Sequence, residues 1–123
     1  MARVLIIDDD ELVRAALVLL LERDGHEVLE ACDGIDAGRI LRVHIPDLVI
    51  TDIVMPEMEG FQVIRKIRKV SPGLKIIAIS GAATIGSQDV LGLASKLGAD
   101  RTFAKPIDRQ EFLSSISRLL AAP

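Results

Sequence analysis

Short aliphatic runs alternate with longer amphipathic stretches from one end of the chain to the other. The runs have the length of strands, and their nearly continuous apolar character is typical of strands that are covered on both faces. The pattern predicts five strands: Arg3–Ile7, Glu27–Ala31, Leu48–Thr51, Leu74–Ile79 and Arg101–Ala104. The second run alternates more between polar and apolar residues, which indicates a strand nearer an edge of the sheet.

Helical patterns follow each of these strands. They predict five helices: Leu12–Arg23, Ile35–Val43, Phe61–Val70, Val90–Leu97 and Arg109–Leu120. Asp10 precedes the first helix as a good N-cap, and Asp108 precedes the last one, three residues before Glu111, as in a capping box. Gly98 follows the fourth helix at a suitable C-cap position.

A strand followed by a helix therefore occurs five times. Parallel strands need crossover connections, and these crossovers are right-handed. The sequence predicts an α/β fold with a doubly wound, five-stranded parallel sheet of the flavodoxin-like (βα)5 type and strand order 2-1-3-4-5. The five units account for residues 1–123, so we expect a single domain.

The composition narrows the classes of function. Half of the residues are hydrophobic and 27% are charged, as in a globular domain, whereas only 2% are aromatic. The net charge of −3 argues against direct binding of nucleic acid. Residues 1–60 carry fourteen Asp or Glu and five Lys or Arg, whereas residues 61–123 carry four and ten, so the halves have net charges of −9 and +6. Carboxylate chemistry is therefore expected in the first half.

Other features indicate an intracellular protein. Cys32 is the only cysteine, which excludes an internal disulfide, and we expect it to be a small packed residue. The longest apolar run, Ala15–Leu21, is far shorter than the roughly 20 residues of a membrane span. The first residues resemble a strand and not a signal sequence, so we expect a cytoplasmic protein without membrane contact.

Chemically active residues stand where the predicted strands end. Asp8, Asp9 and Asp10 follow the first strand, and Asp52, Ser80 and Lys105 follow the third, fourth and fifth strands. In open parallel sheets, ligands bind beyond the carboxyl ends of the strands, where the winding reverses. In the predicted order the first strand is next to the third, so Asp8, Asp9 and Asp52 should lie close together.

Three neighbouring carboxylates repel one another unless a cation neutralises them. Oxygen ligands suit a hard ion, and a small site open to water favours Mg²⁺ over Ca²⁺. A carboxylate nucleophile beside Mg²⁺, a lysine and a hydroxyl is typical of phosphoryl transfer.

Four motifs resemble those of response-regulator receiver domains. They are Ile-Ile-Asp-Asp-Asp at 6–10, Thr-Asp-Ile-Val-Met-Pro at 51–56 with Gly60, Ala-Ile-Ser at 78–80 and Ala-Lys-Pro at 104–106. The resemblance covers essentially the whole chain. It implies that Asp52 is phosphorylated by a phosphohistidine on a sensor histidine kinase or a histidine phosphotransfer protein. It also implies that the chain is a switch and not an enzyme, apart from catalysing its own phosphorylation and slow dephosphorylation.

The same resemblance assigns roles to individual residues. Asp9, Asp52 and the backbone carbonyl of Val54 should ligate Mg²⁺ directly, and Asp8 should hold it through water. Lys105 should pair with the phosphoryl group and the Ser80 hydroxyl should bond to it. The peptide bond between Lys105 and Pro106 is often cis in this family, and Met55, Pro56 and Gly60 should shape the loop after Asp52.

The sequence departs from the family in three places. Thr102 stands where many receivers have an aromatic ring, and strand alternation should point Phe103 into the core. The segment from Ser80 to Gly98 is about three residues longer than expected, so the fourth helix should begin late, near Ser87–Asp89, after a poorly ordered loop at 81–88. Val54 and Ala82 cannot orient a water molecule, so they should not accelerate loss of the phosphoryl group.

Two surfaces remain to be interpreted. Leu12, Ala16 and Leu19 form an apolar stripe on the first helix, and together with Pro106 they are candidates for docking the histidine-bearing partner; alternatively, this helix is simply more buried than average. The basic residues of the third helix, Arg65, Lys66, Arg68 and Lys69, are expected to form a solvated face.

Alternatives to the receiver remain open. One is a Mg²⁺-dependent phosphohydrolase of the haloacid-dehalogenase type, although the acids after the first strand are adjacent and there is no cap domain. Another is a small flavodoxin-like binding module, although no glycine-rich phosphate loop follows the first strand. We expect no output domain within these residues, but the chain could also be the receiver of a larger transcriptional regulator or hybrid kinase.

Overall fold

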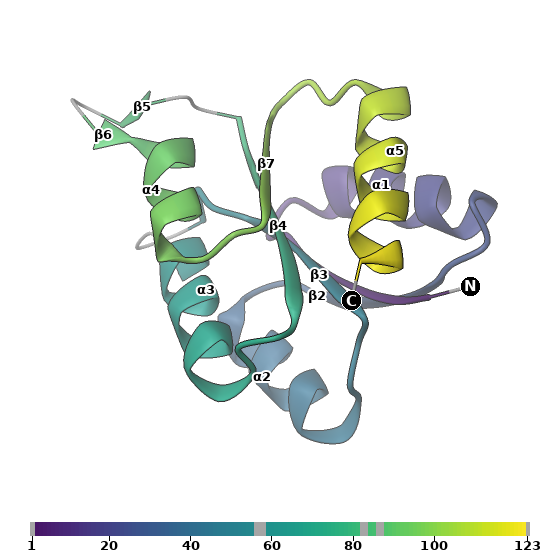
Figure 1. The fold of residues 1–123 in the computed structure, drawn as a ribbon, viewed down its shortest axis with the longest axis horizontal. Coiled ribbons are helices and arrows are strands. Elements are labelled where there is room, and N and C mark those ends of the chain that lie inside the picture. Colours follow the sequence, from purple (N-terminus) through teal and green to yellow (C-terminus); the bar gives the residue numbers. More distant parts are fainter. Residues whose placement is uncertain (1, 56–58, 82–83, 86–87, 123) are drawn as a thin grey trace.

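The protein is built around a single parallel sheet with helices on both faces (Figure 1). The computed structural model describes residues 2–55, 59–81, 84–85 and 88–122. The strands of the large sheet are β1 (Arg3–Ile7), β2 (Glu27–Ala31), β3 (Leu48–Asp52), β4 (Lys75–Ser80) and β7 (Arg101–Ala104). They lie in the order β2-β1-β3-β4-β7, which is the predicted order 2-1-3-4-5, and β2 is an edge strand as expected.

Five helices connect and follow these strands. They are α1 (Glu11–Arg23), α2 (Gly34–Val43), α3 (Glu59–Val70), α4 (Val90–Leu97) and α5 (Arg109–Ala121). Helices α1 and α5 cover one face of the sheet, and α2, α3 and α4 cover the other (Figure 1). The boundaries differ from those predicted by no more than two residues at any end.

The core consists of two aliphatic layers, one on each side of the sheet. Every residue of β3 is buried, because this strand lies in the centre of the sheet and both of its faces are covered. Phe103 lies in the layer beneath α5, where its ring meets that of Phe112 edge to face, with the centroids 5.2 Å apart and the planes at 86°. The prediction that Phe103 points into the core is therefore confirmed.

The register of the strands brings their carboxyl ends to one edge of the sheet. Ile7, the residue before Asp8, is paired with Thr51, the residue before Asp52. Asp52 is in turn paired with Ile79, one residue before Ser80 at the end of β4. Residues that are more than forty positions apart in the sequence are thereby placed next to one another.

The segment between β4 and α4 contains a feature that the sequence did not predict. Two short antiparallel strands pair there, β5 (Thr84–Ile85) and β6 (Gln88–Asp89). Helix α4 begins at Val90, and the carboxylate of Asp89 caps it by accepting a hydrogen bond from the N–H of Gly92 at 3.0 Å. The late start of this helix is thus confirmed. The predicted disorder at 81–88 falls partly on residues outside the described ranges.

One basic residue of α3 does not belong to a solvated face. The Arg68 guanidinium donates hydrogen bonds to the backbone carbonyls of Gly98 at 2.8 Å, Pro72 at 3.2 Å and Leu74, and it pairs with the Asp100 carboxylate at 2.8 Å. Arg68 therefore ties the end of α3 to the loop that precedes β4 and to the loop that precedes β7, and its assignment to a solvated face was wrong. The other three basic residues are exposed, as predicted: Arg65, Lys66 and Lys69.

Cys32 also differs from the prediction. It is exposed at the end of β2, because the strand stops at Ala31 and the chain turns towards α2 at this point. Its placement in the packed interior was therefore wrong. None of the helices in the described ranges is long and apolar enough to cross a membrane.

Candidate functional site

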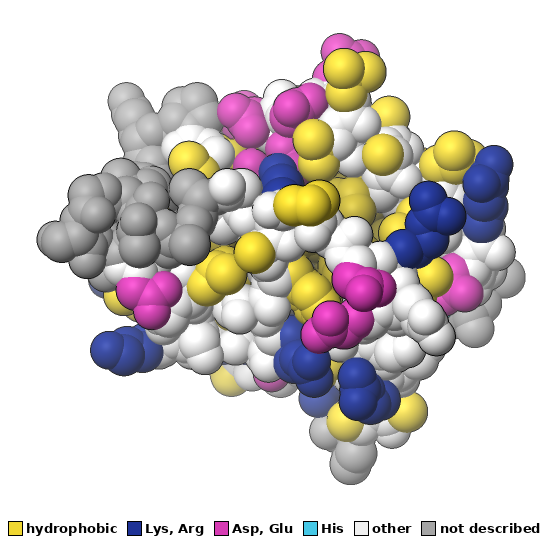
Figure 2. All heavy atoms as spheres, turned by 90° about the horizontal axis from the view of Figure 1, so that it is seen from above, with side chains coloured by type: hydrophobic (Ala, Val, Ile, Leu, Met, Phe, Trp, Pro, Cys, Tyr) yellow, Lys and Arg dark blue, Asp and Glu magenta, His cyan; other side chains and the backbone are white. Residues whose placement is uncertain are grey.

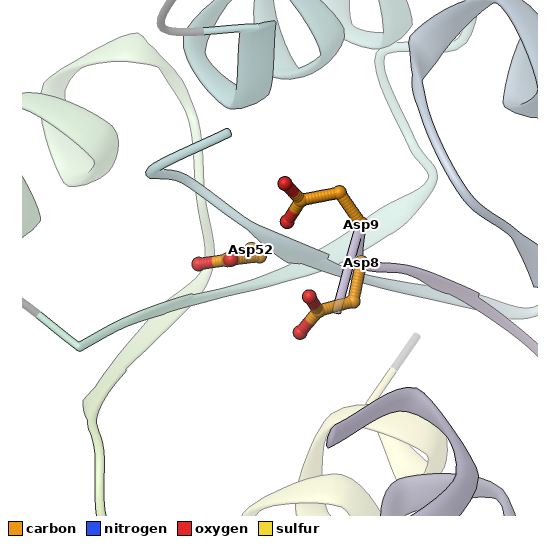
Figure 3. A group of neighbouring side chains, drawn as sticks. All are labelled: Asp8, Asp9 and Asp52. Atoms are coloured by element: carbon orange, nitrogen blue, oxygen red, sulfur yellow. The ribbon is translucent and has the colours of Figure 1, made fainter. Parts of the chain in front are cut away.

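Three carboxylates meet beyond the ends of β1 and β3. Asp8, Asp9 and Asp52 each offer an oxygen, and these oxygens all lie within 4.8 Å of one another. In Figure 3 the Asp9 side chain extends above the strand ends and the Asp8 side chain below them, with the Asp52 carboxylate at a height between the two. Asp8 and Asp52 are buried, with 2% and 6% of their surface exposed, whereas Asp9 is exposed. The trio that was predicted from strand order is therefore brought together by the fold.

The local structure fixes the acids at the end of β1. The N–H of Asp8 continues the ladder to β2 by donating to the carbonyl of Ala31 at 3.1 Å, and the Asp8 carboxylate accepts from the N–H of Asp10 at 2.9 Å. The Asp10 carboxylate caps α1 by accepting from the N–H groups of Leu12 and Val13 at 3.0 and 3.2 Å. Asp10 is thus the N-cap of α1, as predicted, and it lies outside the group formed by Asp8, Asp9 and Asp52.

Lys105 completes the site from the other half of the chain. Its ammonium Nζ lies 3.5 Å from Oδ2 of Asp8 and 3.6 Å from Oδ2 of Asp52. The backbone N–H of Lys105 donates to the carbonyl of Ser80 at 2.9 Å, so the ends of β4 and β7 are held side by side. The Lys105–Pro106 peptide bond is cis, as the resemblance implied.

The electrostatics single out Asp52. Burial raises the pKa of its carboxyl from 3.8 to about 6; the nearby Lys105 lowers the pKa, Asp8 and Asp9 raise it, and a hydrogen bond from the Val54 backbone lowers it. One cation therefore does not fully offset the desolvation of this group and the repulsion by two further acids.

The trio has the chemistry of a divalent cation site. The buried Oδ1 of Asp52 has no hydrogen-bond partner in the described part of the chain, although buried carboxylate oxygens are usually satisfied. Its neighbours are oxygens of two further carboxylates, which are the ligands that Mg²⁺ prefers. The residues present therefore fit Mg²⁺.

Gly60 shapes the backbone next to the trio. A Cβ atom at this position would lie 2.4 Å from the carbonyl oxygen of Asp52 and 2.4 Å from Cα of Ile53, so α3 can approach the end of β3 this closely only with glycine. Met55 is buried, and Pro56 lies outside the described residues. The predicted role of Gly60 thus has a direct steric basis.

The remaining predicted site residues lie on the same edge of the sheet. Ser80 is fully buried at the end of β4, and Val54 lies two residues beyond the end of β3. Thr102 is half-buried on β7, paired with Ala78 of β4. The roles of these residues towards a phosphoryl group or a metal remain predictions.

The candidate docking residues are all exposed. Leu12 and Leu19 expose 82% and 51% of their surface, and Ala16 and Pro106 are exposed as well. The alternative that α1 is simply more buried than average does not hold for these positions. Figure 2 looks onto the end of the molecule where the strands stop, and hydrophobic side chains are exposed there beside a group of acidic ones.

Arg14 supports the acidic site, and the sequence did not predict this. Its Nη1 donates to the backbone carbonyl of Asp8 at 2.7 Å, while its Nε pairs with Glu30 of β2 at 3.1 Å. Arg14 therefore supports the turn that carries Asp8 and Asp9. No local pattern could have indicated this contact, because Glu30 reaches Arg14 only through the pairing of β1 with β2.

Comparisons with known proteins agree with this architecture. The response regulator receiver domain family matches residues 4–117. Protein PilH of Pseudomonas aeruginosa is 36% identical over 121 residues, which cover 98% of this chain and 99% of PilH. Transcriptional regulatory protein AfsQ1 of Streptomyces coelicolor is 40% identical over 107 residues, which cover 87% of this chain but only 46% of AfsQ1.

Solved structures are similar over nearly the whole chain. A CheY-like receiver domain protein from Methanospirillum hungatei superposes with a TM-score of 0.88 at 29% identity, covering 98% of this chain and 94% of that one. A receiver domain from Clostridium thermocellum gives 0.87 at 34% identity with the same coverage. The matches do not favour the haloacid-dehalogenase-type phosphohydrolase. The chain belongs to the response regulator receiver domain family, whose members are signalling domains of two-component systems.

Proposed function

We propose that this chain is a phosphorylation-dependent switch in which Asp52 accepts a phosphoryl group from a phosphohistidine of a sensor histidine kinase or histidine phosphotransfer protein. The observation that carries the proposal is the placement of Asp52. Its buried carboxylate lies within 4.8 Å of the oxygens of Asp8 and Asp9, and 3.6 Å from the ammonium of Lys105. The proposed setting is the cytoplasm.

The transfer is a single displacement at phosphorus. An oxygen of the Asp52 carboxylate forms a bond to phosphorus while the bond from phosphorus to the imidazole nitrogen breaks, and the electron pair of that bond stays on the nitrogen. A phosphoimidazole that is protonated on its other nitrogen leaves as neutral imidazole, so no proton has to come from this chain. Asp52 must be ionised to attack, which the neighbouring Lys105 favours and burial opposes.

Bound Mg²⁺ would supply positive charge to the transferring phosphoryl oxygens. The residues that would hold it are Asp9, Asp52 and the carbonyl of Val54, with Asp8 acting through water. The Lys105 ammonium, which contacts both buried acids, is placed to pair with the added phosphoryl charge. The Ser80 hydroxyl is proposed to donate to a phosphoryl oxygen, and this contact would carry the change of state towards α4.

The acceptor can be tested with a small phosphodonor. Incubation of the protein with acetyl phosphate and Mg²⁺, followed by intact-mass measurement, should add one acid-stable, base-labile phosphate. Asp52→Asn should prevent the addition, whereas Asp10→Asn should not, because Asp10 caps α1 outside the trio. Phosphate on the Asp52→Asn protein, or sustained release of inorganic phosphate typical of a hydrolase, would contradict the proposal.

The docking surface is proposed to be the exposed stripe of α1, formed by Leu12, Ala16 and Leu19, together with Pro106. A charge at Leu19 should slow transfer from a phosphohistidine donor, because a carboxylate would be desolvated on contact with an apolar partner. Leu19→Glu should leave phosphorylation by acetyl phosphate unchanged. Gln62→Glu, an exposed change on α3, serves as the matched control. Equal rates for the two variants with the phosphohistidine donor would exclude the stripe.

A further inference from the structure

A groove runs between α2 and α3. These two helices lie on the face of the sheet opposite α1 and α5 (Figure 1). Its cavity has a volume of about 670 Å³. The walls come from the two helices, and the groove continues to the loops that follow them, which contribute Ile45, Pro46 and Leu74. None of the residues assigned to the acidic site lines this groove.

The lining is apolar and remains exposed where the groove opens. Ala37 and Ile67 form part of the buried core beneath it. Ile45 and Val70 also line the groove, yet they expose 86% and 73% of their surface. Large aliphatic side chains exposed beside an apolar cavity are a feature of interaction sites.

Gly38 lines the α2 side of the groove and has no side chain to fill it. It lies in the interior of α2, where glycine costs about 1 kcal/mol relative to alanine. A Cβ atom at Gly38 would meet nothing within 4 Å, so packing within this chain does not require glycine at this position. The open space over Gly38 is available to a group from another molecule.

Two cations face the groove, one from each helix. Arg42 of α2 and Lys66 of α3 both line it, and within the described ranges neither forms an ion pair. Asp47, the acid that lines the groove, already accepts a hydrogen bond from the backbone N–H of Arg3 at 2.8 Å. The groove therefore offers an apolar floor beside two positive charges that have no ion-pair partner in the described part of the chain, which is complementary to an apolar segment flanked by carboxylates.

The secondary structure of the walls restricts the shape of the occupant. An extended peptide that adds to a protein as a strand needs the free backbone groups of a sheet edge. Here both walls are helices, whose backbone groups are bonded internally, so recognition along the walls uses side chains. A helix that presents apolar residues at i, i+3, i+4 and i+7 meets this requirement.

We propose that the groove between α2 and α3 binds an acidic amphipathic helix of a protein partner, with its apolar residues over Gly38 and its carboxylates near Arg42 and Lys66. The sheet separates this groove from α1, where the phosphohistidine partner is proposed to dock. Both partners can therefore be bound at the same time. The groove thus provides a means of recruiting or localising the switch that does not depend on the phosphorylation of Asp52.

The test uses a defined peptide and a variant that fills the groove. The probe is a fluorescein-labelled synthetic helical peptide with leucines at i, i+3, i+4 and i+7 and glutamates beside them; a second peptide carries lysines in place of the glutamates. In fluorescence anisotropy the glutamate peptide should bind the wild type at least about tenfold more tightly than the lysine peptide. Gly38→Leu should weaken this binding at least about tenfold without lowering the free energy of unfolding, because its side chain enters open space.

Charge reversal provides the second readout. The double change Arg42→Glu and Lys66→Glu should weaken the binding of the glutamate peptide and strengthen the binding of the lysine peptide. Arg65 lies on α3, as Lys66 does, but it is exposed and does not line the groove, so Arg65→Glu should leave the binding of both peptides unchanged. Phosphorylation by acetyl phosphate should continue in every variant, so failure here is separate from failure of the proposed switch.

Three outcomes would overturn the proposal. The first is the absence of saturable binding of the glutamate peptide at concentrations up to about 1 mM, where even weak complexes form. The second is binding that Gly38→Leu leaves unchanged. The third is self-association of the wild type that Gly38→Leu abolishes, since that result would assign the groove to a second copy of this chain.

Discussion

Replacing Asp52 with asparagine should stabilise the metal-free protein at neutral pH. The carboxyl is 6% exposed, and its pKa is raised from 3.8 to about 6, first by burial. Each pKa unit corresponds to about 1.4 kcal/mol, so a difference of about two units corresponds to about 3 kcal/mol. Asparagine has nearly the same shape and carries no charge, so the variant is free of this penalty.

The sign of the pH dependence follows from the direction of the shift. Between pH 3.8 and about 6 the folded protein keeps a proton on Asp52 that the unfolded chain has released. The stability contributed by this group is therefore fully present below pH 3.8 and is lost as the pH rises through about 6. The difference in unfolding free energy between Asp52→Asn and the wild type should grow from about 0.5 kcal/mol at pH 4 to about 3 kcal/mol at pH 7.5.

Urea unfolding in the presence of EDTA measures this difference. Circular dichroism is the suitable probe, because the chain has no tryptophan or tyrosine. Asp10→Asn is the control, since asparagine also caps helices and Asp10 lies outside the trio. Mg²⁺ should stabilise the wild type and have much less effect on Asp52→Asn. A difference between the two proteins that is constant from pH 4 to pH 7.5 would refute the electrostatic argument.

Three further predictions concern individual side chains. Gly60→Ala should lower the unfolding free energy by about 1–3 kcal/mol, measured by urea unfolding, because its Cβ would lie 2.4 Å from the Asp52 carbonyl oxygen. Arg68→Ala should lower it by about 1–3 kcal/mol by leaving three carbonyls and a carboxylate without their donor, whereas the exposed Lys69→Ala should change it little. Val54→Asn should hasten the loss of phosphate from Asp52, because an amide can orient a water molecule and valine cannot. Intact-mass measurement over time gives the decay rate, and an unchanged rate would exclude an effect of this position on hydrolysis.

The order of elements along the chain could be predicted from the sequence because it depends on local patterns. Aliphatic runs of strand length alternate with helical periodicity, and crossover rules then leave few arrangements of a parallel sheet. The caps at Asp10 and Asp108 were equally local, because a capping carboxylate bonds to N–H groups two or three residues away. The proximity of Asp8 and Asp9 to Asp52 could be predicted from the strand order alone.

Several contacts could not be predicted in this way. The pattern placed Arg68 among four solvated basic residues, but two loops come together around it, and they provide carbonyl acceptors and the carboxylate of Asp100. Cys32 appeared to be packed, but the end of β2 leaves it in solvent. The strands β5 and β6 are two residues each, too short to produce a periodic signal. Segments distant in sequence decide the environment of Arg68, and the end of a strand decides that of Cys32.

The sequence by itself determined the fold, the edge of the sheet that carries chemistry and the residues that gather there, because each depends on periodicity or on the order of strands. Only the tertiary structure decided how strongly these residues act on one another. The pKa of Asp52 depends on its burial and on the position of Lys105, which is fifty-three residues away along the chain. The groove beside Gly38 likewise exists only where α2 and α3 pack together. Electrostatic energies and cavities depend on distances in space, and those distances are set only when the elements have packed.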